Sequence, residues 1–288
     1  MLCNGCPRKC NIDREVTTGV CGVPFLPKIA KAYLHKWEEP CISGDRGSGT
    51  IFFSGCNLKC VYCQNYDISS EAKGKIVSVE RLAQIFKELE EKGATNINLV
   101  SPSHYIDVII SAIDIYRPSI PIVYNSNGYD SIESLDRLKG YIDIFLMDFK
   151  YIDESLSNMY SRAKDYPKIA KANLLKARQL QPKEVFDGDI MKKGVIIRHL
   201  VLPNHTDNSI KVLEWIKDNI DDPFISLMGQ YVPMYKAKDY PKINRKIKPL
   251  EYKIVEKKLV DLGLTRGYIQ DLSSAEEKYT PEFDFSGV

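Results

Sequence analysis

Short apolar runs alternate with longer amphipathic segments along most of the chain after residue 63. In segment 77–92, Val79, Leu82, Ile85, Phe86 and Leu89 recur at helical spacing and form one apolar stripe. The pattern predicts helices at 77–92, 105–116, 131–138, 169–180, 209–220 and 250–262. It predicts strands at 49–54, 96–100, 120–124, 142–147, 195–201 and 224–227.

Regular alternation of strands and helices predicts βα units and a parallel sheet. About six such units with right-handed crossovers would curl into an open barrel, so we expect an α/β fold with a partial (β/α)6 barrel. The expected domains are a cysteine-rich metal-binding module at 1–47, the barrel at 48–265, and a tail at 266–288. In that tail, Tyr279, Phe283 and Phe285 are expected to pack on the barrel.

Composition narrows the expected partners. The 288 residues carry a formal net charge of +2, which is too small to attract nucleic acid or a membrane by bulk charge. We find no run of ~18 apolar residues that could span a membrane, and the cysteine-bearing start does not resemble a secretory signal. We therefore expect a cytoplasmic protein with neither a membrane nor a nucleic acid as its partner.

All eight cysteines lie in the first quarter of the chain. In a reducing compartment, cysteines gathered in this way are expected to be metal ligands rather than disulfides. Cys56, Cys60 and Cys63 have C-x3-C-x2-C spacing directly after the first predicted strand. Three thiolates on a [4Fe-4S] cluster leave one iron free to bind a substrate, so these residues are the candidate catalytic ligands. A catalytic zinc ion and a chance grouping are the alternatives, because structural zinc normally has four ligands.

The first four cysteines have a second spacing that suits a metal. Cys3, Cys6, Cys10 and Cys21 offer four thiols within ~20 residues, enough to close a site by themselves. Zinc would support the local fold, whereas a second [4Fe-4S] cluster could relay electrons. Free thiols are the alternative, and Cys41 is expected to be an ordinary small core residue.

Polar residues close or follow four of the predicted strands, and the active sites of parallel barrels gather at the carboxyl ends of the strands. The segments are Ser101-Pro102-Ser103-His104, Asn125-Ser126-Asn127-Gly128, Asp148-Phe149-Lys150 and Arg198-His199. Loop and helix-cap roles are the alternative for each residue taken alone. Gln230 and Tyr231 follow the last predicted strand, where they could line the substrate mouth or serve as core and turn residues.

The cysteine triplet resembles that of the radical S-adenosylmethionine (radical SAM) superfamily. The resemblance implies that SAM binds the free iron, that Tyr62 lies against its adenine, and that SAM is cleaved to methionine and a 5′-deoxyadenosyl radical. Lys150, Arg198 and His199 could bind the carboxylate of SAM, and Asp148, Asn125 and Ser103 could accept hydrogen bonds from its ammonium group. Ser101, His104 and Ser126 complete the expected SAM-binding set.

Within that superfamily the chain is most similar to activating enzymes of glycyl radical enzymes, of the pyruvate formate-lyase activase kind. Asn125-Ser126-Asn127-Gly128 resembles their D-T-N-G motif, and Asp148-Phe149-Lys150 resembles their D-x-K motif. Segment 198–203 resembles their R-H/Y-x-x-x-P motif. The likeness implies that Lys150 and His199 are SAM ligands and that an electron donor such as flavodoxin or ferredoxin is a partner.

Two segments differ from these activases. Ser101-Pro102-Ser103-His104 replaces their G-G-E segment, and Asn125 replaces an aspartate that helps to hold a monovalent cation. These features, with segment 37–44, resemble the activase-like branch often called PflX. The expected reaction is hydrogen abstraction, with a glycine of a glycyl radical enzyme as one target. A small molecule, peptide or RNA is the alternative substrate, and a non-catalytic iron–sulfur or zinc protein is the remote alternative.

Overall fold

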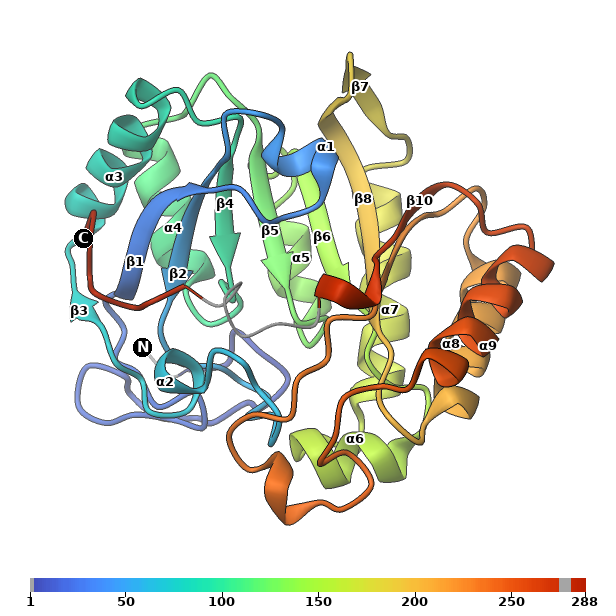
Figure 1. The fold of residues 1–288 in the computed structure, drawn as a ribbon. Coiled ribbons are helices and arrows are strands. Elements are labelled where there is room, and N and C mark those ends of the chain that lie inside the picture. Colours follow the sequence, from blue (N-terminus) through green and yellow to red (C-terminus); the bar gives the residue numbers. More distant parts are fainter. Residues whose placement is uncertain (1–2, 275–280) are drawn as a thin grey trace.

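A sheet with a parallel centre organises the molecule (Figure 1). The computed structural model describes residues 3–274 and 281–288. Its strands are β1 Lys28–His35, β2 Ser48–Phe53, β3 Lys75–Ile76, β4 Ile97–Val100, β5 Ile122–Ser126, β6 Ile144–Asp148, β7 Val185–Asp187, β8 Ile190–Leu200, β9 Phe224–Met228 and β10 Gly267–Ile269. Across the described residues the order is β10-β9-β8-β6-β5-β4-β2-β1-β3, and β7 pairs with the first residues of β8. From β2 through β10 in that order the strands run parallel, whereas β1 pairs antiparallel with both β2 and β3.

Most helices lie on the outer face of this sheet (Figure 1). They are α1 Pro40–Ser43, α2 Tyr66–Ser69, α3 Val79–Glu91, α4 Ile106–Ile115, α5 Ile132–Arg137, α6 Glu154–Ser161, α7 Tyr166–Leu180, α8 Thr206–Asn219 and α9 Pro249–Asp261. Two short 3₁₀ turns follow at Ala237–Asp239 and Leu272–Ser274. Ser78 caps α3 by accepting a hydrogen bond from the Arg81 amide, as its place before an amphipathic segment leads one to expect.

The predicted α/β fold with a mainly parallel sheet is confirmed. The six predicted strands correspond to β2, β4, β5, β6, β8 and β9, and the six predicted helices to α3, α4, α5, α7, α8 and α9. The apolar pattern did not predict β1, because Lys28, Lys31 and His35 interrupt its apolar residues. It did not predict β10 because three residues are too few to show a period. β10 extends the parallel sheet within the segment that was expected to form a tail.

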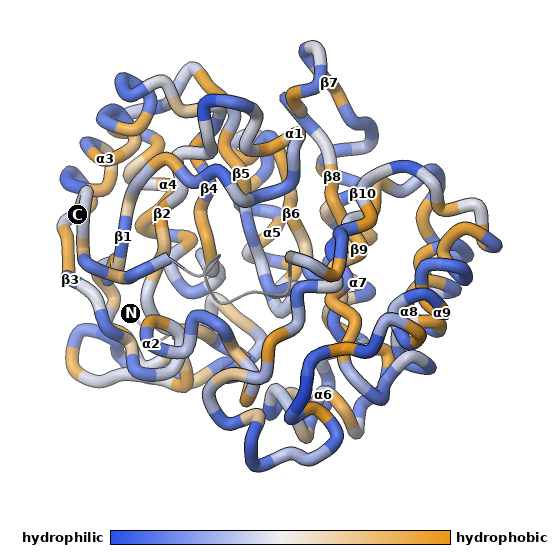
Figure 2. The backbone as a smooth tube through the Cα atoms, viewed as in Figure 1, coloured by the Kyte–Doolittle hydropathy of each residue, from blue (hydrophilic) through white to orange (hydrophobic). Residues whose placement is uncertain are grey.

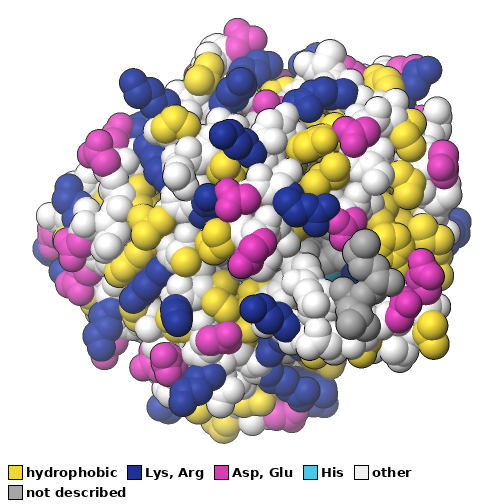
Figure 3. All heavy atoms as spheres, turned by 180° about the vertical axis from the view of Figure 1, so that it is seen from behind, with side chains coloured by type: hydrophobic (Ala, Val, Ile, Leu, Met, Phe, Trp, Pro, Cys, Tyr) yellow, Lys and Arg dark blue, Asp and Glu magenta, His cyan; other side chains and the backbone are white. Residues whose placement is uncertain are grey.

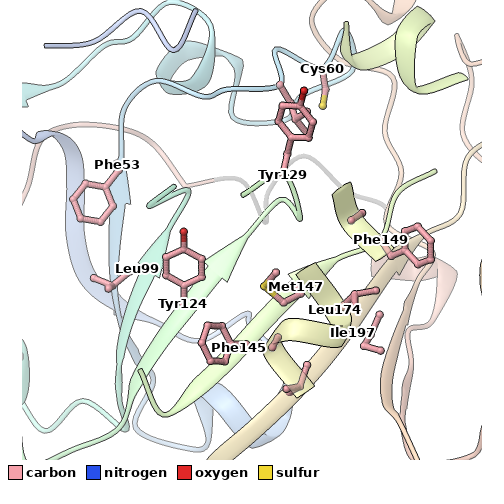
Figure 4. Packing of buried hydrophobic residues seen from close by; sticks show 14 of the residues in the cluster. Phe53, Cys60, Leu99, Tyr124, Tyr129, Phe145, Met147, Phe149, Leu174 and Ile197 are labelled. Atoms are coloured by element: carbon pink, nitrogen blue, oxygen red, sulfur yellow. The ribbon is translucent and has the colours of Figure 1, made fainter. Parts of the chain in front are cut away.

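Both faces of the central strands are buried, which explains their continuous apolar runs. In β6, Phe145 and Met147 belong to the large hydrophobic cluster beneath the outer helices, part of which Figure 4 shows. Ile144 and Leu146 point the opposite way and belong to a smaller cluster inside the barrel. Figure 2 shows the resulting hydrophobic stretches along β4 and β5.

Helix α1 fills part of the barrel interior. Cys41 and Ile42 are fully buried and pack in the inner cluster with residues of β5, β6, β8 and β9. Asn96, just before β4, donates from Nδ2 to the Ile42 carbonyl at 2.7 Å, and Thr95 donates to the Ser43 carbonyl at 2.9 Å. The amino ends of the parallel strands therefore hold α1 inside the barrel, and Cys41 is a core residue as expected.

The last eight residues run along β1. The Phe283 ring packs edge-on against Phe52 at 5.4 Å between centroids, and the Phe285 amide donates to the Ala30 carbonyl at 3.1 Å. Lys31 forms an ion pair with Asp284 at 3.0 Å. Tyr279, which was expected to pack with these residues, lies outside the described residues.

Candidate active site

The three cysteines lie on the loop between β2 and α2. The loop leaves β2 at Gly55, whose φ of 83° brings its Cα so near the Cys21 carbonyl that a Cβ would lie 2.8 Å from that oxygen. Glycine is therefore required at this turn. Cys60 is buried beyond the strand ends, near Tyr129 (Figure 4), whereas Cys56 and Cys63 are half-buried.

Each sulfur has a hydrogen-bond partner from a different part of the chain. Asn127 Nδ2 and the Leu58 amide each lie 3.4 Å from Cys56 Sγ. Ser161 Oγ, at the end of α6, lies 3.0 Å from Cys60 Sγ, and Ser69 Oγ donates to Cys63 Sγ at 3.2 Å. Hydrogen bonds to the sulfurs are among the factors that set the potential of an iron–sulfur cluster.

Two of these thiols have raised pKa values, as does the core residue Cys41. Burial raises the pKa of the Cys60 thiol to about 12, although Lys150 opposes the shift, and burial raises the pKa of Cys63 too. A coordinated metal removes the proton of a buried thiol outright. Among the described residues, no group of three or more His, Cys, Asp or Glu side chains lies close enough together to hold a metal ion, either at this loop or at Cys3, Cys6, Cys10 and Cys21.

A buried ionic cluster lies at the ends of the neighbouring strands. Asp148 on β6 and Arg198 on β8 are paired in register, and Arg198 Nε donates to Asp148 Oδ1 at 2.8 Å. Lys150 Nζ lies 2.5 Å from Asp148 Oδ2, and Arg198 Nη2 donates to Asn125 Oδ1 at 2.5 Å. Burial alone would raise the pKa of Asp148, but Arg198 and Lys150 together hold it below its usual value. Asp148 therefore carries a negative charge at neutral pH.

Two acidic residues of segment 37–44, which were not among the predicted site residues, complete this cluster. Glu38 and Glu39 lie between β1 and α1. Glu38 Oε2 lies 3.4 Å from Arg198 Nη1, while Asn98 Nδ2 donates to Glu38 Oε1 at 3.0 Å. Burial raises the pKa of both carboxyl groups, and the Arg198 guanidinium opposes that shift.

One large cavity joins the cysteine loop to these charges. Its volume is about 1250 Å³, and it reaches from the loop to the amino ends of the strands. Seven of the predicted site residues line it: Cys60, Tyr62, Cys63, Asn125, Asp148, Lys150 and Arg198. Gln230 and Tyr231 line the cavity as well, in agreement with the first of the two roles expected for them.

The remaining predicted SAM-binding residues lie away from the cavity. His199 is fully buried between Phe149 and α8, with Nδ1 2.6 Å from the Phe149 carbonyl oxygen and Nε2 2.8 Å from Ser209 Oγ. His104 Nε2 lies 2.8 Å from the Ser54 carbonyl oxygen. The other three, Ser101, Ser103 and Ser126, follow or end β4 and β5 without lining the cavity, and Ser126 donates to Asp130.

The amino-terminal cysteines pack against the cysteine loop. The Cys56 amide donates to the Cys21 carbonyl at 3.3 Å, and Lys59 Nζ donates to the same carbonyl at 3.1 Å. Burial raises the pKa of Cys6 to about 11, and the neighbouring cysteines, Cys3 among them, add to the shift. The two cysteine sets are thus adjacent in space.

The surface carries charge of both signs. Figure 3 shows Lys and Arg side chains mixed with Asp and Glu over one face, in keeping with the formal net charge of +2. In the part of the chain that the structure describes, every helix is too short or too polar to cross a membrane.

Three comparisons relate the chain to known proteins. A family model described as the Radical SAM superfamily matches residues 50–216. The uncharacterized protein MJ0674 of Methanocaldococcus jannaschii is 35% identical over 267 residues, covering 89% of this chain and 73% of that protein. The pyruvate formate-lyase-activating enzyme of Clostridium pasteurianum is 25% identical over 199 residues, covering 65% of this chain and 76% of that enzyme.

A solved structure shares the fold. The crystal structure of SuiB from Streptococcus suis bound to S-adenosylmethionine superposes with a TM-score of 0.54 at 14% identity. The match covers 77% of this chain, which spans about half the length of SuiB (50%). At this identity the match is informative about the fold alone.

Proposed function

This chain belongs to the radical SAM superfamily and is an enzyme, and we propose that it abstracts hydrogen from a polar substrate held in the barrel cavity. In this superfamily a [4Fe-4S] cluster binds SAM and cleaves it reductively to methionine and a 5′-deoxyadenosyl radical. Cys56, Cys60 and Cys63 would hold that cluster, because each sulfur already has a hydrogen-bond partner that suits a thiolate.

We assign SAM binding to residues that line the cavity beside the cysteine loop. Tyr62 lines the cavity beside Cys63, and its hydroxyl lies 2.5 Å from the Tyr151 hydroxyl, so we assign this ring to the adenine. Lys150 lines the cavity and acts on the Cys60 sulfur, so we assign it to the carboxylate of SAM, with Asp148 and Asn125 as acceptors for the ammonium. His199 is a weaker candidate, since both of its ring nitrogens already have partners away from the cavity.

The observation that carries the proposal is the size and charge of the cavity. Pockets for one drug-sized ligand usually measure about 300–1,000 Å³. At about 1250 Å³ this cavity has room for a second molecule besides SAM. Its inner wall carries Glu38, Glu39 and Arg198, and buried charges of this kind suit a polar substrate.

Activation of a glycyl radical enzyme is the second candidate function. It is supported by the 25% identity to a pyruvate formate-lyase-activating enzyme. Under this reading an extended loop of a partner protein enters the cavity and presents a glycine. Either reaction would also need an electron donor, such as flavodoxin or ferredoxin, as a protein partner. The buried ionic wall favours a small molecule or a charged peptide, because a glycine has no side chain to match it.

The amino-terminal cysteines are proposed as a second metal site. The Cys56 amide donates a hydrogen bond to the Cys21 carbonyl. A metal on Cys3, Cys6, Cys10 and Cys21 would therefore brace the loop of the catalytic cluster. A zinc ion would serve as a brace alone, whereas a saturated [4Fe-4S] cluster could also pass electrons.

The test is reductive cleavage of SAM by the anaerobically reconstituted protein. With dithionite as reductant, we expect 5′-deoxyadenosine from the wild type and none above background from Cys56→Ala. Cys41→Ala, which also removes one buried thiol, is the matched control and should still form the product. Equal product from wild type and Cys56→Ala would refute the proposed function. Deuterated substrates, including a glycyl radical enzyme labelled at glycine, would then show which one transfers label into 5′-deoxyadenosine.

A further inference from the structure

The Glu39 carboxylate lies unsatisfied on the wall of the cavity. The residue is only 8% exposed, and no described residue donates a hydrogen bond to its Oε2 atom. Glu39 stands at the N-cap of α1, yet its side chain makes no capping hydrogen bond. Burial of a carboxylate is costly unless it is paired, so a role in capping does not explain why it is here.

Charges around Glu39 do not balance. The buried cluster contains three carboxylates, on Asp148, Glu38 and Glu39, and two cations, on Lys150 and Arg198. Lys150 pairs with Asp148 and is assigned to the SAM carboxylate, and Arg198 is shared between Asp148 and Glu38. One buried carboxylate is therefore left without a cation of its own.

Neighbouring groups supply few donors to Glu39. Burial has the largest effect and raises the pKa of Glu39, and the Glu38 charge adds to that shift; the Arg198 guanidinium, the backbone amide of Glu39 itself and the Ser226 hydroxyl on β9 lower the pKa. The Tyr268 hydroxyl and the Cys41 thiol are the other titratable groups on which the Glu39 charge acts. A second cavity-lining acceptor, Gln270 Oε1, is buried and has no hydrogen-bond partner among the described residues.

We propose that Glu39 binds a cationic nitrogen of the substrate, an ammonium or a guanidinium, with Gln270 Oε1 as a further acceptor. This inference rests on the proposed function and names the class of its substrate. A bound cation would supply the positive charge that the buried cluster lacks. It would also donate hydrogen bonds to Glu39 Oε2 and Gln270 Oε1, which have no donor among the described residues. A charge-assisted hydrogen bond of this kind corresponds to about a tenfold or larger effect on affinity.

The test compares a small cation with its neutral counterpart. Saturation-transfer NMR at pH 7.5 on the anaerobically reconstituted protein measures the binding of n-butylammonium, n-butylguanidinium and 1-butanol. We expect at least one cation to bind the wild type about tenfold more tightly than the alcohol does. Glu39→Gln should abolish this preference, and Glu39→Asp, which keeps the charge, should retain part of it. Asp45→Asn is the matched control, because Asp45 lines the same cavity but is exposed to water.

Three outcomes would overturn the proposal. In the first, the wild type binds 1-butanol as well as either cation, which would mean that Glu39 is a protonated, neutral group. In the second, Glu39→Gln retains the preference; in the third, Asp45→Asn loses it equally. If Glu39→Gln does not fold, the wild-type comparison of cation and alcohol still decides. The same preparations are assayed for 5′-deoxyadenosine, so that loss of SAM cleavage with intact cation binding refutes the proposed function and not this subsite.

Discussion

Replacement of Arg198 by methionine should destabilise the fold in a way that depends on pH. The guanidinium is 13% exposed, lies 2.8 Å from Asp148 and 3.4 Å from Glu38, and also donates to Asn125. Methionine fills much of the same space but leaves the carboxylates without their shared cation. Glu38 suffers most, because Asp148 keeps Lys150 as a partner.

The size of the effect follows from the cost of breaking a buried ion pair. Removal of one partner typically costs about 3–5 kcal/mol, because the other charge stays buried and uncompensated. A chain of 288 residues has an unfolding entropy of about 0.6 kcal/mol/K, so the loss corresponds to about 5–8 °C in the unfolding midpoint.

The sign of the pH dependence follows from the carboxyl groups. In the wild type the pKa of Asp148 is lowered, so this residue stabilises the fold above about pH 4 and that contribution is lost as pH falls through its folded pKa. Without Arg198, the folded pKa of Glu38, which burial already raises in the wild type, would rise further, and the folded pKa of Asp148 would rise as well. The folded variant would then bind more protons than the unfolded chain, and its stability would fall as pH rises. We therefore expect the deficit of R198M to be largest near pH 7–8 and to shrink toward pH 5.

The assay is thermal unfolding of preparations with equal iron content at several pH values. R137M is the matched control, since the Arg137–Asp107 ion pair is about half exposed (50% and 48%). An exposed pair contributes about 0–1 kcal/mol, so R137M should shift the midpoint little. The reasoning is wrong if R198M loses no more stability than R137M, or if its deficit does not shrink as pH is lowered.

Two further predictions concern the frame of the site. Gly128→Ala places a Cβ 2.2 Å from the Asp148 carbonyl oxygen, so it should lower both stability and SAM cleavage. Gly140→Ala has the same positive φ near 80° but open space, and should cost only about 1 kcal/mol with cleavage unchanged; equal losses in both would contradict the clash. At the proposed second metal site, Cys6→Ala should lower the content of iron or zinc per chain, whereas Cys41→Ala should leave it unchanged. Equal metal content in the two variants would contradict that site.

The fold was predictable wherever strands are buried on both faces. Such strands read as continuous apolar runs, and each predicted run lies on a parallel strand of the sheet. β1 was not predicted because it mixes buried and half-buried residues at the antiparallel side of the sheet, and so has no continuous apolar run. α6 was not predicted because three serines and one asparagine, which have low helix propensity, occupy half of its eight positions. Its last residue, Ser161, contacts Cys60, which is distant in sequence.

The candidate site was predictable in position but not residue by residue. Successive side chains of a strand point to opposite faces, so neighbouring polar residues cannot both reach the barrel interior. Arg198 and Asn125 point inward and line the cavity, whereas His199 and Ser126 point outward to Ser209 and Asp130. Once one inward-pointing residue is known, this alternation separates the residues that line the cavity from those that point away from it.

Glu38 and Glu39 could not be found in that way, because they belong to no parallel strand. Charged residues on a connecting loop are usually exposed to water. What brings them inside is α1, whose apolar Cys41 and Ile42 dock in the barrel and carry the two preceding carboxylates with them. Burial of those charges requires a cation from another element, which explains why Arg198 reaches across from β8. Since that single guanidinium also serves Asp148, the position of α1 leaves the cavity with a carboxylate that a cationic ligand would satisfy.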